Sequence, residues 1–581
     1  MDKEILHMVR SVMGCMLVTA LAAGCAQEDI GNAPSEGGGL SATSYVSLSF
    51  ASPQGTPTRA NNPTGGETGD GQETGQANEN AITSAVAFFY QGDNGVNSQD
   101  NTPIKAVVSF NNIGNGTDEN STGVDRTYTT LPQQVDLENG TYNVIVVANP
   151  GADWWTDQSL TLDDVRNHIQ TTAWTASGSD YSDFVMTSAA DATLTLNSNP
   201  ESDPAKATVN VERMAARLDY KTTGTYTCTD PAYPGATVEI TGAALVNNLT
   251  AGSYLLKRVA ADVNDVPTYL GNETPDAGVQ TNYVLDPWTA GKTSTNNSFT
   301  IGGEANKTAE DLYGEWFGNI SQDPNYWAAY VQPGTSVSDG WLRIGYTLEN
   351  TTAADAAGSD YSTGVVFKAK FHPKGVANYT DGATFFEHGT TLYASMEDMM
   401  KVFYGNKFDQ LGNIANCSTW GEVRQFITST LLNDDPSGYD KYLEGLAEGK
   451  DDADAVADAV ADASSLTWSN YMLNECGYSR DGNGKVVLDQ KGKVTRIALK
   501  PYGTRTYEDA TCYYTWWVRH SNDNDDTKNG IMEYAIVRNN IYKLTVESVY
   551  SLGDPVPGDK GLRVKVYVNN WLLLDPETLP M

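Results

Sequence analysis

Residues able to form a metal or nucleophilic centre are few in this chain, and they are widely scattered. The sequence contains five histidines, and no two of them stand four residues apart as they do in helical zinc motifs. The G-x-S-x-G turn that presents a nucleophilic serine is also missing from the sequence. The histidines beyond the N-terminal segment are His168, His372, His388 and His520. The sequence therefore predicts no catalytic residues, no metal and no cofactor, and a protein that is not an enzyme.

Two short motifs resemble ligand-binding loops but lack a required glycine. Residues 291–293 read Gly-Lys-Thr like the end of a phosphate-binding loop, but Asp286 stands where its first glycine belongs. The acidic stretch 523–526 resembles a calcium loop, but Lys528 replaces the glycine of its sharp turn. We reject the phosphate site. For the acidic stretch we prefer a solvated loop, with a weakly bound surface ion as the alternative.

The cysteines do not indicate a metal site either. Of the six, Cys15 and Cys25 lie in the N-terminal segment, and no C-x-x-C spacing occurs among the rest. The remaining cysteines are Cys228, Cys417, Cys476 and Cys512. Outside the cytoplasm these residues could form disulfides. Buried free thiols are the equal alternative.

Length and charge set the broad class of protein. The chain has 581 residues, which is too long for a single core, so two domains are expected. Its net charge of −36 repels phosphate backbones and anionic lipid, so nucleic acid is excluded as a partner. Only 19% of the residues are charged, while Gly, Thr, Asn and Tyr are abundant, a mixture typical of strands and turns.

The first residues have the pattern of an export signal. Lys3 and Arg10 precede an apolar run over 12–23, which is too short to span a membrane. Small residues then lead directly to Cys25, as in a bacterial lipobox, so we expect Cys25 to be the acylated N-terminus of the exported chain. The alternative is a plain signal peptide in which Cys25 has no role.

A short strand and a single arginine follow this signal. Val46, Leu48 and Phe50 alternate along one face, which predicts a half-buried strand. Arg59 comes next, and it is the only basic residue between Arg10 and Lys105. A trypsin-like protease would therefore find one site here, between Arg59 and Ala60, in a segment without apolar periodicity. The alternative is a solvated arginine in a loop.

Further along, short alternating strands are separated by turn residues. Clear examples are residues 135–149, in which a turn at Asn139-Gly140 leads into a buried strand, and residues 364–371 and 534–550. Helices are expected at 161–170, where two aspartates occupy the first turn, and in the Ala-rich acidic stretch 441–463. The pattern predicts a mainly β fold with two β-sandwich-like domains in tandem and short helical insertions.

Several segments in order along the chain resemble the fimbrillins of type V pili from Bacteroides-like bacteria, specifically the Mfa-like major subunits. The most specific segment, 533–546, reads EYAIVRNNIYKLTV and is followed by Leu552-Gly553. The other segments are 139–150, 183–188, 209–217, 364–373 and 385–395. The resemblance implies transthyretin-like sandwich domains and a structural subunit of a cell-surface fimbria that supports adhesion.

The resemblance also implies a route of assembly. The precursor would reach the outer membrane as a lipoprotein carrying its lipid, such as palmitate, on Cys25. An Arg-specific protease would cut after Arg59 and remove the strand with Val46, Leu48 and Phe50. Loss of this strand would open a groove in the sheet, and the C-terminal segment of an identical subunit would then fill that groove. Further partners would be accessory, tip and anchor subunits and surface ligands on host or bacterial cells.

The C-terminal residues match such a donor segment. Val564, Val566 and Val568 alternate on one face, whereas Trp571 and Leu573 continue on the other parity after Asn569-Asn570, where we expect a register break. We therefore expect Trp571, Leu573 and Leu579 to belong to the transferred strand, with 562–568 staying on its own sheet. The alternative is that the whole stretch is this domain's own last strand.

The expected organisation has seven parts in order along the chain. They are a lipoprotein signal peptide (1–24), a propeptide with the removable strand (25–59), a flexible linker (60–80), an N-terminal β-sandwich domain (81–260), a turn-rich connection (261–340), a C-terminal β domain (341–561) with the acidic helical insertion (441–463), and the donor segment (562–581). Two other functions stay open: a tip or anchor fimbrillin or another glycan- or protein-binding surface lipoprotein, and, less favoured, a glycan hydrolase.

Overall fold

The structure is a computed structural model, and every residue that it describes belongs to the compact unit Ala42–Met581. The described residues are 43–51, 72–95, 98–113, 117–118, 126–151, 153–155, 159–178, 180–250, 252–260, 268–269, 283–284, 286–287, 299–301, 304–307, 324–351, 362–395, 398–399, 401–402, 504–520, 533–557 and 563–572. The fold is mainly β, as predicted, and its sheets are consistent with β-sandwich domains in tandem.

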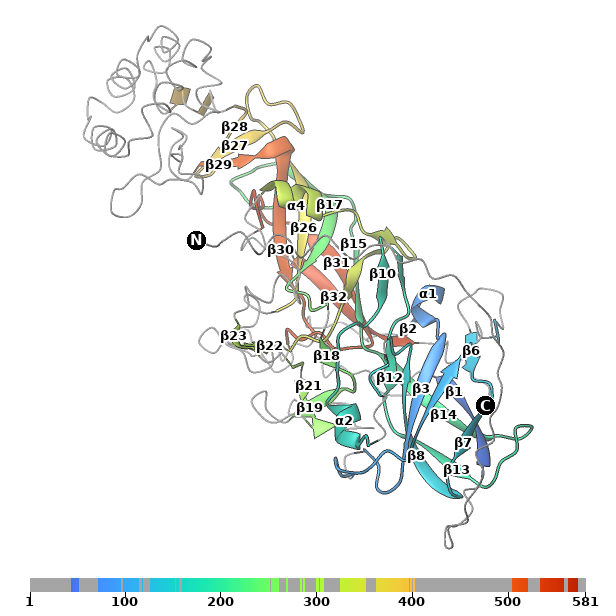
Figure 1. Ribbon diagram of the computed structural model, residues 1–581. Helices are drawn as coiled ribbons and strands as arrows, with labels where there is room; N and C mark the ends of the chain where they lie inside the picture. Colours follow the sequence, from blue (N-terminus) through green and yellow to red (C-terminus); the bar gives the residue numbers. More distant parts are fainter. Residues whose placement is uncertain are drawn as a thin grey trace, which may run out of the picture. The chain divides into compact units, whose positions relative to one another are not determined.

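The largest sheet is built from strands that lie between residues 43 and 213 (Figure 1). Its strands follow the order β4-β3-β8-β12-β14-β1-β6-β5, with β13 added on β8 and β7 on β1. Their bounds are β1 (Thr43–Ala51), β3 (Ser84–Tyr90), β4 (Ala106–Asn111), β5 (Thr117–Asp118), β6 (Arg126–Thr129), β7 (Gln133–Asp136), β8 (Gly140–Ala148), β12 (Met186–Ser188), β13 (Ala192–Leu196) and β14 (Ala205–Arg213).

This sheet closes around its own core. Phe110 of β4 and Tyr128 of β6 come from strands near opposite ends of the sheet, yet both are buried in the same apolar cluster. β3 is buried on both faces: Phe89 belongs to that cluster, while Phe88 belongs with Ile145 and Val147 to a second cluster on the other side. Burial on both faces explains why β3 and β8 read as nearly continuous apolar runs.

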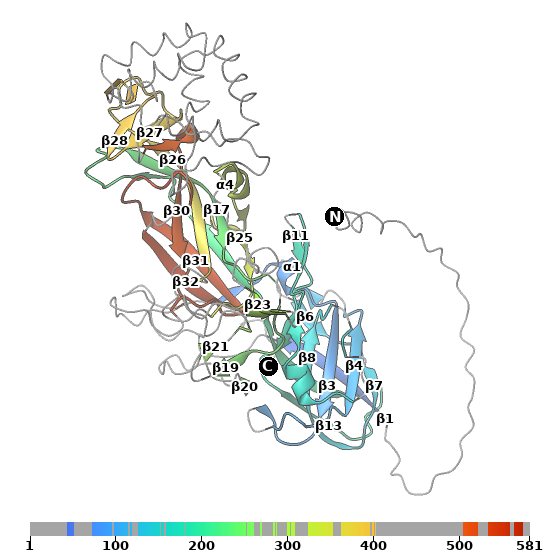
Figure 2. The ribbon, with the colours of Figure 1, turned by 60° about the vertical axis from the view of Figure 1, so that its left-hand side comes forward.

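Two further sheets form the second sandwich (Figure 2). The strand orders are β2-β32-β31-β15-β25-β24 and β16-β17-β26-β30. Leu218, Tyr542 and Leu544 from the first of these sheets share one buried cluster with Val238 and Phe367 from the second. The bounds are β2 (Gln72–Thr74), β15 (Ala216–Lys221), β16 (Thr225–Thr227), β17 (Thr237–Val246), β24 (Thr335–Ser336), β25 (Leu342–Thr347), β26 (Gly364–His372), β30 (Thr511–Trp517), β31 (Asn540–Ser548) and β32 (Arg563–Leu572).

Shorter elements complete the described fold. The small strands are β9 (Ile169–Gln170), β10 (Thr175–Ser177), β11 (Asp180–Ser182), β18 (Ser253–Tyr254), β19 (Arg258–Ala260), β20 (Thr268–Tyr269), β21 (Tyr283–Val284), β22 (Phe299–Ile301), β23 (Glu304–Lys307), β27 (Phe385–His388), β28 (Thr391–Tyr393) and β29 (Thr504–Tyr507). The helices include α1 (Ala77–Asn80), α2 (Leu162–Arg166), α4 (Pro324–Tyr330) and the 3₁₀ turn η4 (Glu508–Ala510). Over the described residues, no helix is both long and apolar enough to cross a membrane.

The structure differs from the expected boundaries in three places. The end of the expected linker, residues 72–80, forms β2 and α1, because partners far along the chain hold it. β15 and β17, expected in the first domain (81–260), instead belong to the sheets of the second sandwich. The helix expected at 161–170 ends at Arg166, since Ile169–Gln170 pairs with β18 as β9. The expected acidic helix at 441–463 lies outside the described residues.

Candidate functional site

The predicted N-terminal strand is present as β1, and it lies inside the large sheet rather than at its edge. On one side it pairs in parallel with β14, from Val46 opposite Ala205 to Ala51 opposite Asn210. On the other side its first half pairs with β7 and its second half with β6, both antiparallel. β1 therefore satisfies the backbone groups of strands on both of its flanks.

The inward face of β1 is wholly buried. Val46 and Leu48 are 0% exposed and Phe50 is 1% exposed, and all three belong to the core cluster of the first sandwich. Burying an aliphatic or aromatic side chain of this size stabilises a fold by about 1.5–3 kcal/mol. Val46, Leu48 and Phe50 are therefore part of the hydrophobic core of the first sandwich.

The loop after β6 closes over β1 through Thr130. The Leu48 amide donates to Thr130 Oγ1 (2.9 Å), and the Thr130 amide donates back to the Leu48 carbonyl (2.8 Å). Ser47 Oγ donates to the Thr130 carbonyl at 2.8 Å. Thr130 is 3% exposed, so these bonds are shielded from water. Loss of β1 would leave donors and acceptors of Thr130 unpaired in the groove.

Three predicted processing residues lie outside the part of the chain that the structure describes: Cys25, Arg59 and Ala60. Their roles stay predictions. The structure does place the chain on both sides of the expected cut: β1 ends at Ala51 before it, and β2 begins at Gln72 after it.

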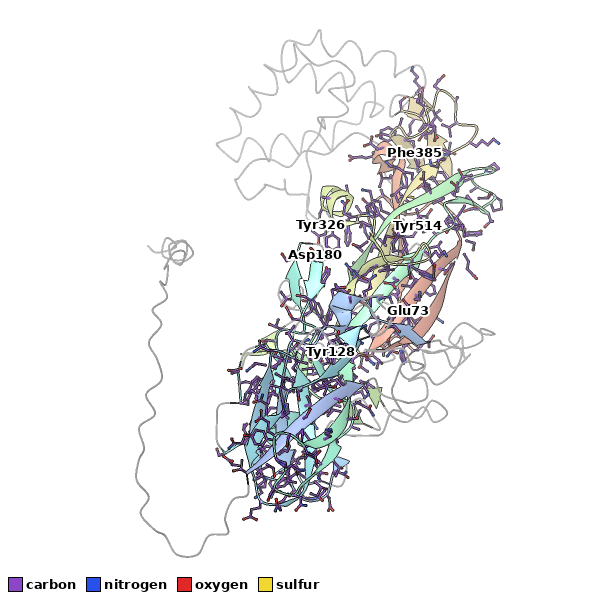
Figure 3. All side chains as sticks on the ribbon, turned by 90° about the vertical axis from the view of Figure 1, so that its right-hand side faces the viewer. Glu73, Tyr128, Asp180, Tyr326, Phe385 and Tyr514 are labelled. Carbon is purple, nitrogen blue, oxygen red and sulfur yellow. The ribbon has the colours of Figure 1, made fainter. Side chains whose placement is uncertain are left out.

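The segment that follows the expected cut is held by a buried ionic cluster, which we call the β2 clamp; it comprises Glu73, Glu79, Arg217, Asp219 and Lys543. Arg217 reaches Glu79 at 2.7 Å, Glu73 at 2.6 Å and Asp219 at 2.9 Å. Lys543 of β31 contacts the second oxygen of Glu73 at 2.5 Å. Figure 3 labels Glu73 within the structure. The clamp ties β2 and α1 to β15 and β31.

Glu79 is the most fully paired carboxylate of the β2 clamp. It is 0% exposed and accepts from Arg217 and, at 2.8 Å, from the Gln76 amide that begins α1. The other carboxylate oxygen of Glu79 accepts a hydrogen bond from the hydroxyl of Tyr346. The main-chain carbonyl of Glu79 accepts one from the guanidinium of Arg213 at 3.0 Å. A buried carboxylate needs such partners, because its charge has lost its water.

Electrostatics within the β2 clamp follow from burial and charge together. Burial alone would raise the pKa of Glu73, but the hydrogen bond from Lys543 and the charge of Arg217 outweigh it and hold that pKa below its ordinary value. Burial would lower the pKa of Arg217, but the carboxylates of Glu79 and Asp219 raise it instead. Arg217 thus stays charged at any physiological pH.

We expect Glu73→Gln to weaken the fold at neutral pH and progressively less in acid. The folded-state pKa of Glu73 lies below 4.5, so its carboxylate stabilises the fold above that pH, and this contribution is lost as the pH falls through the lowered folded-state pKa. Urea unfolding at several pH values measures the difference between variant and parent. Glu201→Gln, at an exposed turn residue, is the matched control and should equal the parent throughout. A gap for Glu73→Gln that stays constant with pH would contradict the assignment.

The C-terminal strand β32 pairs with its own chain. β31 and β32 are antiparallel from Val546 opposite Val564 to Asn540 opposite Asn570, so the alternating segment stays on its own sheet as expected. The expected register break at Asn569-Asn570 is wrong, because both asparagines continue the ladder along β31.

β2 pairs with the C-terminal end of β32. Trp571, expected in the transferred segment, lies opposite Glu73 in the parallel pairing of β2 with β32. Leu573 and Leu579 lie outside the described residues. β2, which the β2 clamp holds, therefore lies directly beside residues 570–572 at the C-terminal end of β32.

Cys228 and Cys512 are free and buried, so the structure contains no disulfide between them. Burial raises the pKa of the Cys512 thiol to about 12 and also raises that of Cys228. Cys417 and Cys476 lie outside the described residues. Within the described ranges, no group of three or more His, Cys, Asp or Glu side chains is placed to hold a metal ion.

Both buried thiols should resist alkylation in the folded chain. Iodoacetamide reacts with the thiolate, which a raised pKa and burial make scarce at mildly alkaline pH. Peptide mass spectrometry should find Cys228 and Cys512 unmodified in native protein and fully modified in denaturant. Rapid labelling of Cys512 under native conditions would contradict its placement in the core.

Residues 505–575 match the family described as major fimbrial subunit protein type IV, fimbrillin, C-terminal. Over this region the chain is similar to the C-terminal part of fimbrillins. The match covers β30, β31 and β32, which are the strands that carry the C-terminal end of the second sandwich. It also includes the whole of the segment 533–546 and Leu552-Gly553. None of the curated proteins matches the chain.

Several solved structures resemble this chain at low sequence identity. A proposed cell adhesion protein from Parabacteroides distasonis is 11% identical, with a TM-score of 0.39, covering 91% of this chain and 100% of its own. A fimbrilin from Porphyromonas gingivalis is 13% identical with a TM-score of 0.33 (91% and 98%). The tip fimbrial protein Mfa3 of the same species is 10% identical with a TM-score of 0.32 (91% and 100%). These TM-scores are low, so the similarity to fimbrillins rests on residues 505–575.

The β2 clamp is the part of this site that the sequence did not predict. Glu73 meets Arg217 across 144 positions and Lys543 across 470. One signal was available: Arg213 and Arg217 flank the apolar residues 214–216 between two strands, and a buried arginine requires carboxylate partners. Nothing in the sequence indicates which of the 73 acidic residues supplies them.

Proposed function

We propose that this protein is a structural subunit of a cell-surface fimbria, polymerised by strand exchange. The observation that carries the proposal is the position of β1. Its inward side chains are 0–1% exposed, and it is paired on both sides inside the sheet, yet it is joined to the rest of the chain by the single segment 52–71. One cut in that segment would free a strand that the sandwich core needs.

The maturation route has two chemical steps. Export as a lipoprotein would attach lipid at Cys25 and hold the precursor at the outer membrane. An Arg-specific protease would then hydrolyse the bond between Arg59 and Ala60, which separates β1 and its lipid from the mature chain. The β2 clamp supports this order, because it keeps the new N-terminal segment on the second sandwich after β1 has gone.

Departure of β1 would leave a groove suited to another strand. β14 would present unpaired backbone groups along Ala205–Asn210, and the pockets of Val46, Leu48 and Phe50 would be empty. Such an edge accepts an extended segment by β-augmentation. Each backbone hydrogen bond would contribute about 0.5–1.5 kcal/mol. Each well-filled pocket would contribute about 1.5–3 kcal/mol.

We propose the end of the chain, residues 573–581, as the donor to the next subunit. β32 itself stays on its own sheet up to Leu572, so the donor begins where β2 ends its pairing. Leu573 and Leu579 are the apolar residues that we expect to enter the groove. A contact of this kind joins the tail of one subunit to the body of the next, so it yields an open filament.

Limited digestion tests this function. The soluble precursor is treated with an Arg-specific protease, followed by N-terminal sequencing and negative-stain electron microscopy. We expect a new N-terminus at Ala60 together with filaments, and neither for the Arg59→Ala control. Clean cleavage with persistent monomers would contradict a shaft role, and filaments from the uncut control would contradict the need for cleavage.

A further inference from the structure

A cavity of about 410 Å³ opens beside the β10–β11 hairpin. Its lining comes from that hairpin, β17, β25, the end of α4 and the segment leading from α4 to β24. Figure 3 marks this region by Tyr326 on α4 and Asp180 on β11. The volume falls within the range of small-ligand sites, roughly 300–1,000 Å³. No residue of β1 lines the cavity, so it is distinct from the groove proposed above.

Three half-buried aromatic rings line this cavity: Trp174, Tyr181 and Tyr330. The rings of Trp174 and Tyr181 both rest against Tyr346, with centroids 6.1 Å and 4.8 Å from it. Tyr330 stacks on Tyr326 at 5.1 Å. Each of the three rings is thus packed against another aromatic side chain, which gives the cavity apolar walls held in place by ring contacts.

One polar group of the lining is left unsatisfied. Asn248 is 8% exposed, and its side-chain oxygen has no hydrogen-bond partner among the described residues. Buried acceptors without a donor are rare in folded proteins and call for an explanation. A ligand that brings a hydroxyl or amide donor into the cavity would supply the missing bond.

The charge of the cavity favours a neutral ligand. Among the described residues that line the cavity, Arg343 is the only charged one. Its guanidinium already lies over the rings of Tyr181 (5.1 Å) and Tyr346 (5.2 Å), and its Nη1 donates to the Tyr346 hydroxyl at 3.0 Å. The net charge of −36 repels anions from the protein as a whole.

We propose that this cavity binds a neutral sugar ring. A pyranose has an apolar C–H face that packs on an aromatic ring, and hydroxyls around its edge that donate hydrogen bonds. The walls formed by Trp174, Tyr181 and Tyr330 match the face, and the free acceptor of Asn248 matches a hydroxyl. The site makes the subunit itself a glycan-binding surface, whether or not it polymerises.

Titration of the full exported chain with methyl glycosides of glucose, galactose, mannose and N-acetylglucosamine tests the proposal, read by tryptophan fluorescence and calorimetry. We expect saturable binding of at least one glycoside, about tenfold weaker affinity in Asn248→Ala from the lost hydrogen bond, and no binding in Ala176→Trp. Ala176 is an exposed lining residue, so the tryptophan fills the cavity without opening the core. Tyr550→Ala, at a residue 63% exposed elsewhere, is the matched control and should bind like the parent.

Thermal melts of all variants distinguish a loss of binding from a loss of folding. The Ala176→Trp variant should have the same melting temperature as the parent. The proposal is overturned if no glycoside binds the parent chain, or if affinity is the same in Asn248→Ala and Ala176→Trp as in the parent. Binding of short neutral peptides in place of glycosides, lost in the same variants, would overturn the sugar assignment too.

Discussion

Leu48→Asp should prevent the precursor from keeping its N-terminal sandwich folded. Leu48 is 0% exposed in the middle of β1, among core side chains from β3, β8 and β14. Truncating a buried leucine costs about 2–5 kcal/mol, and an unpaired carboxylate in the same place adds a desolvation cost. Because a whole domain is stable by only about 5–15 kcal/mol, we expect loss of cooperative unfolding, measured by tryptophan fluorescence in urea.

Ser49→Asp is the matched control for this variant. Ser49 is the next residue of β1, is half-buried on the opposite face and contacts Thr129 Oγ1 at 3.0 Å. The same charge there remains within reach of water, so we expect a small loss of stability. Equal stability of the Leu48→Asp precursor and the parent would show that β1 contributes little to the core, and the assembly proposal would lose its basis.

Arg217→Met should be the most damaging single change in the β2 clamp. The side chain of Arg217 is 1% exposed. Its loss would leave the carboxylates of Glu79 and Asp219, which are both 0% exposed, without this counter-ion. Removing one partner of a buried ion pair costs about 3–5 kcal/mol, because the remaining charge has neither water nor a counter-ion. Urea unfolding should show this loss, and protease digestion should show early cleavage near β2.

Arg505→Met provides the matched comparison. Arg505 also pairs with a carboxylate, reaching Asp554 at 3.0 Å, but its side chain is 45% exposed. Surface pairs of this kind contribute about 0–1 kcal/mol. If Arg217→Met costs no more than Arg505→Met, the clamp does not hold the β2 segment, and another contact must anchor it.

Local patterns predicted individual elements well. The alternation of Val46, Leu48 and Phe50 predicts β1 because a two-residue period places those side chains on one face, whatever the partner strand is. The two aspartates of the first turn likewise predict the start of α2, and in the structure the Asp164 amide donates to the Thr161 hydroxyl that caps this helix. These signals act within a few residues and need no knowledge of the fold.

Pairing between distant segments could not be predicted. The parallel partner of β1 is β14, and the residue opposite Val46 is Ala205, a choice made by the packing of the whole core. Residues 72–80 have a linker's composition, and they are ordered by Arg217 and Lys543, which belong to other strands. The ladder through Asn569-Asn570 continues for the same reason: β31 offers backbone partners that the local sequence does not reveal.

The central claim is that the C-terminal segment of one subunit takes the place of β1 in the next. Thr208 of β14 is exposed and lies opposite Ser49 of β1, so a strand in that groove must pass beside it. Thr208→Cys is combined in turn with a cysteine at each residue of 573–579, in chains with Cys417 and Cys476 replaced by serine. Each chain is cleaved with the Arg-specific protease, oxidised and run on a non-reducing gel.

We expect disulfide-linked ladders of subunits at one or two of these positions, only after cleavage, and none in chains that also carry Arg59→Ala. The position that cross-links best fixes the register of the donor beside β14. Ladders of equal strength before cleavage, or none at any position in cleaved chains that do form filaments, would contradict the exchange of β1 for the C-terminal segment.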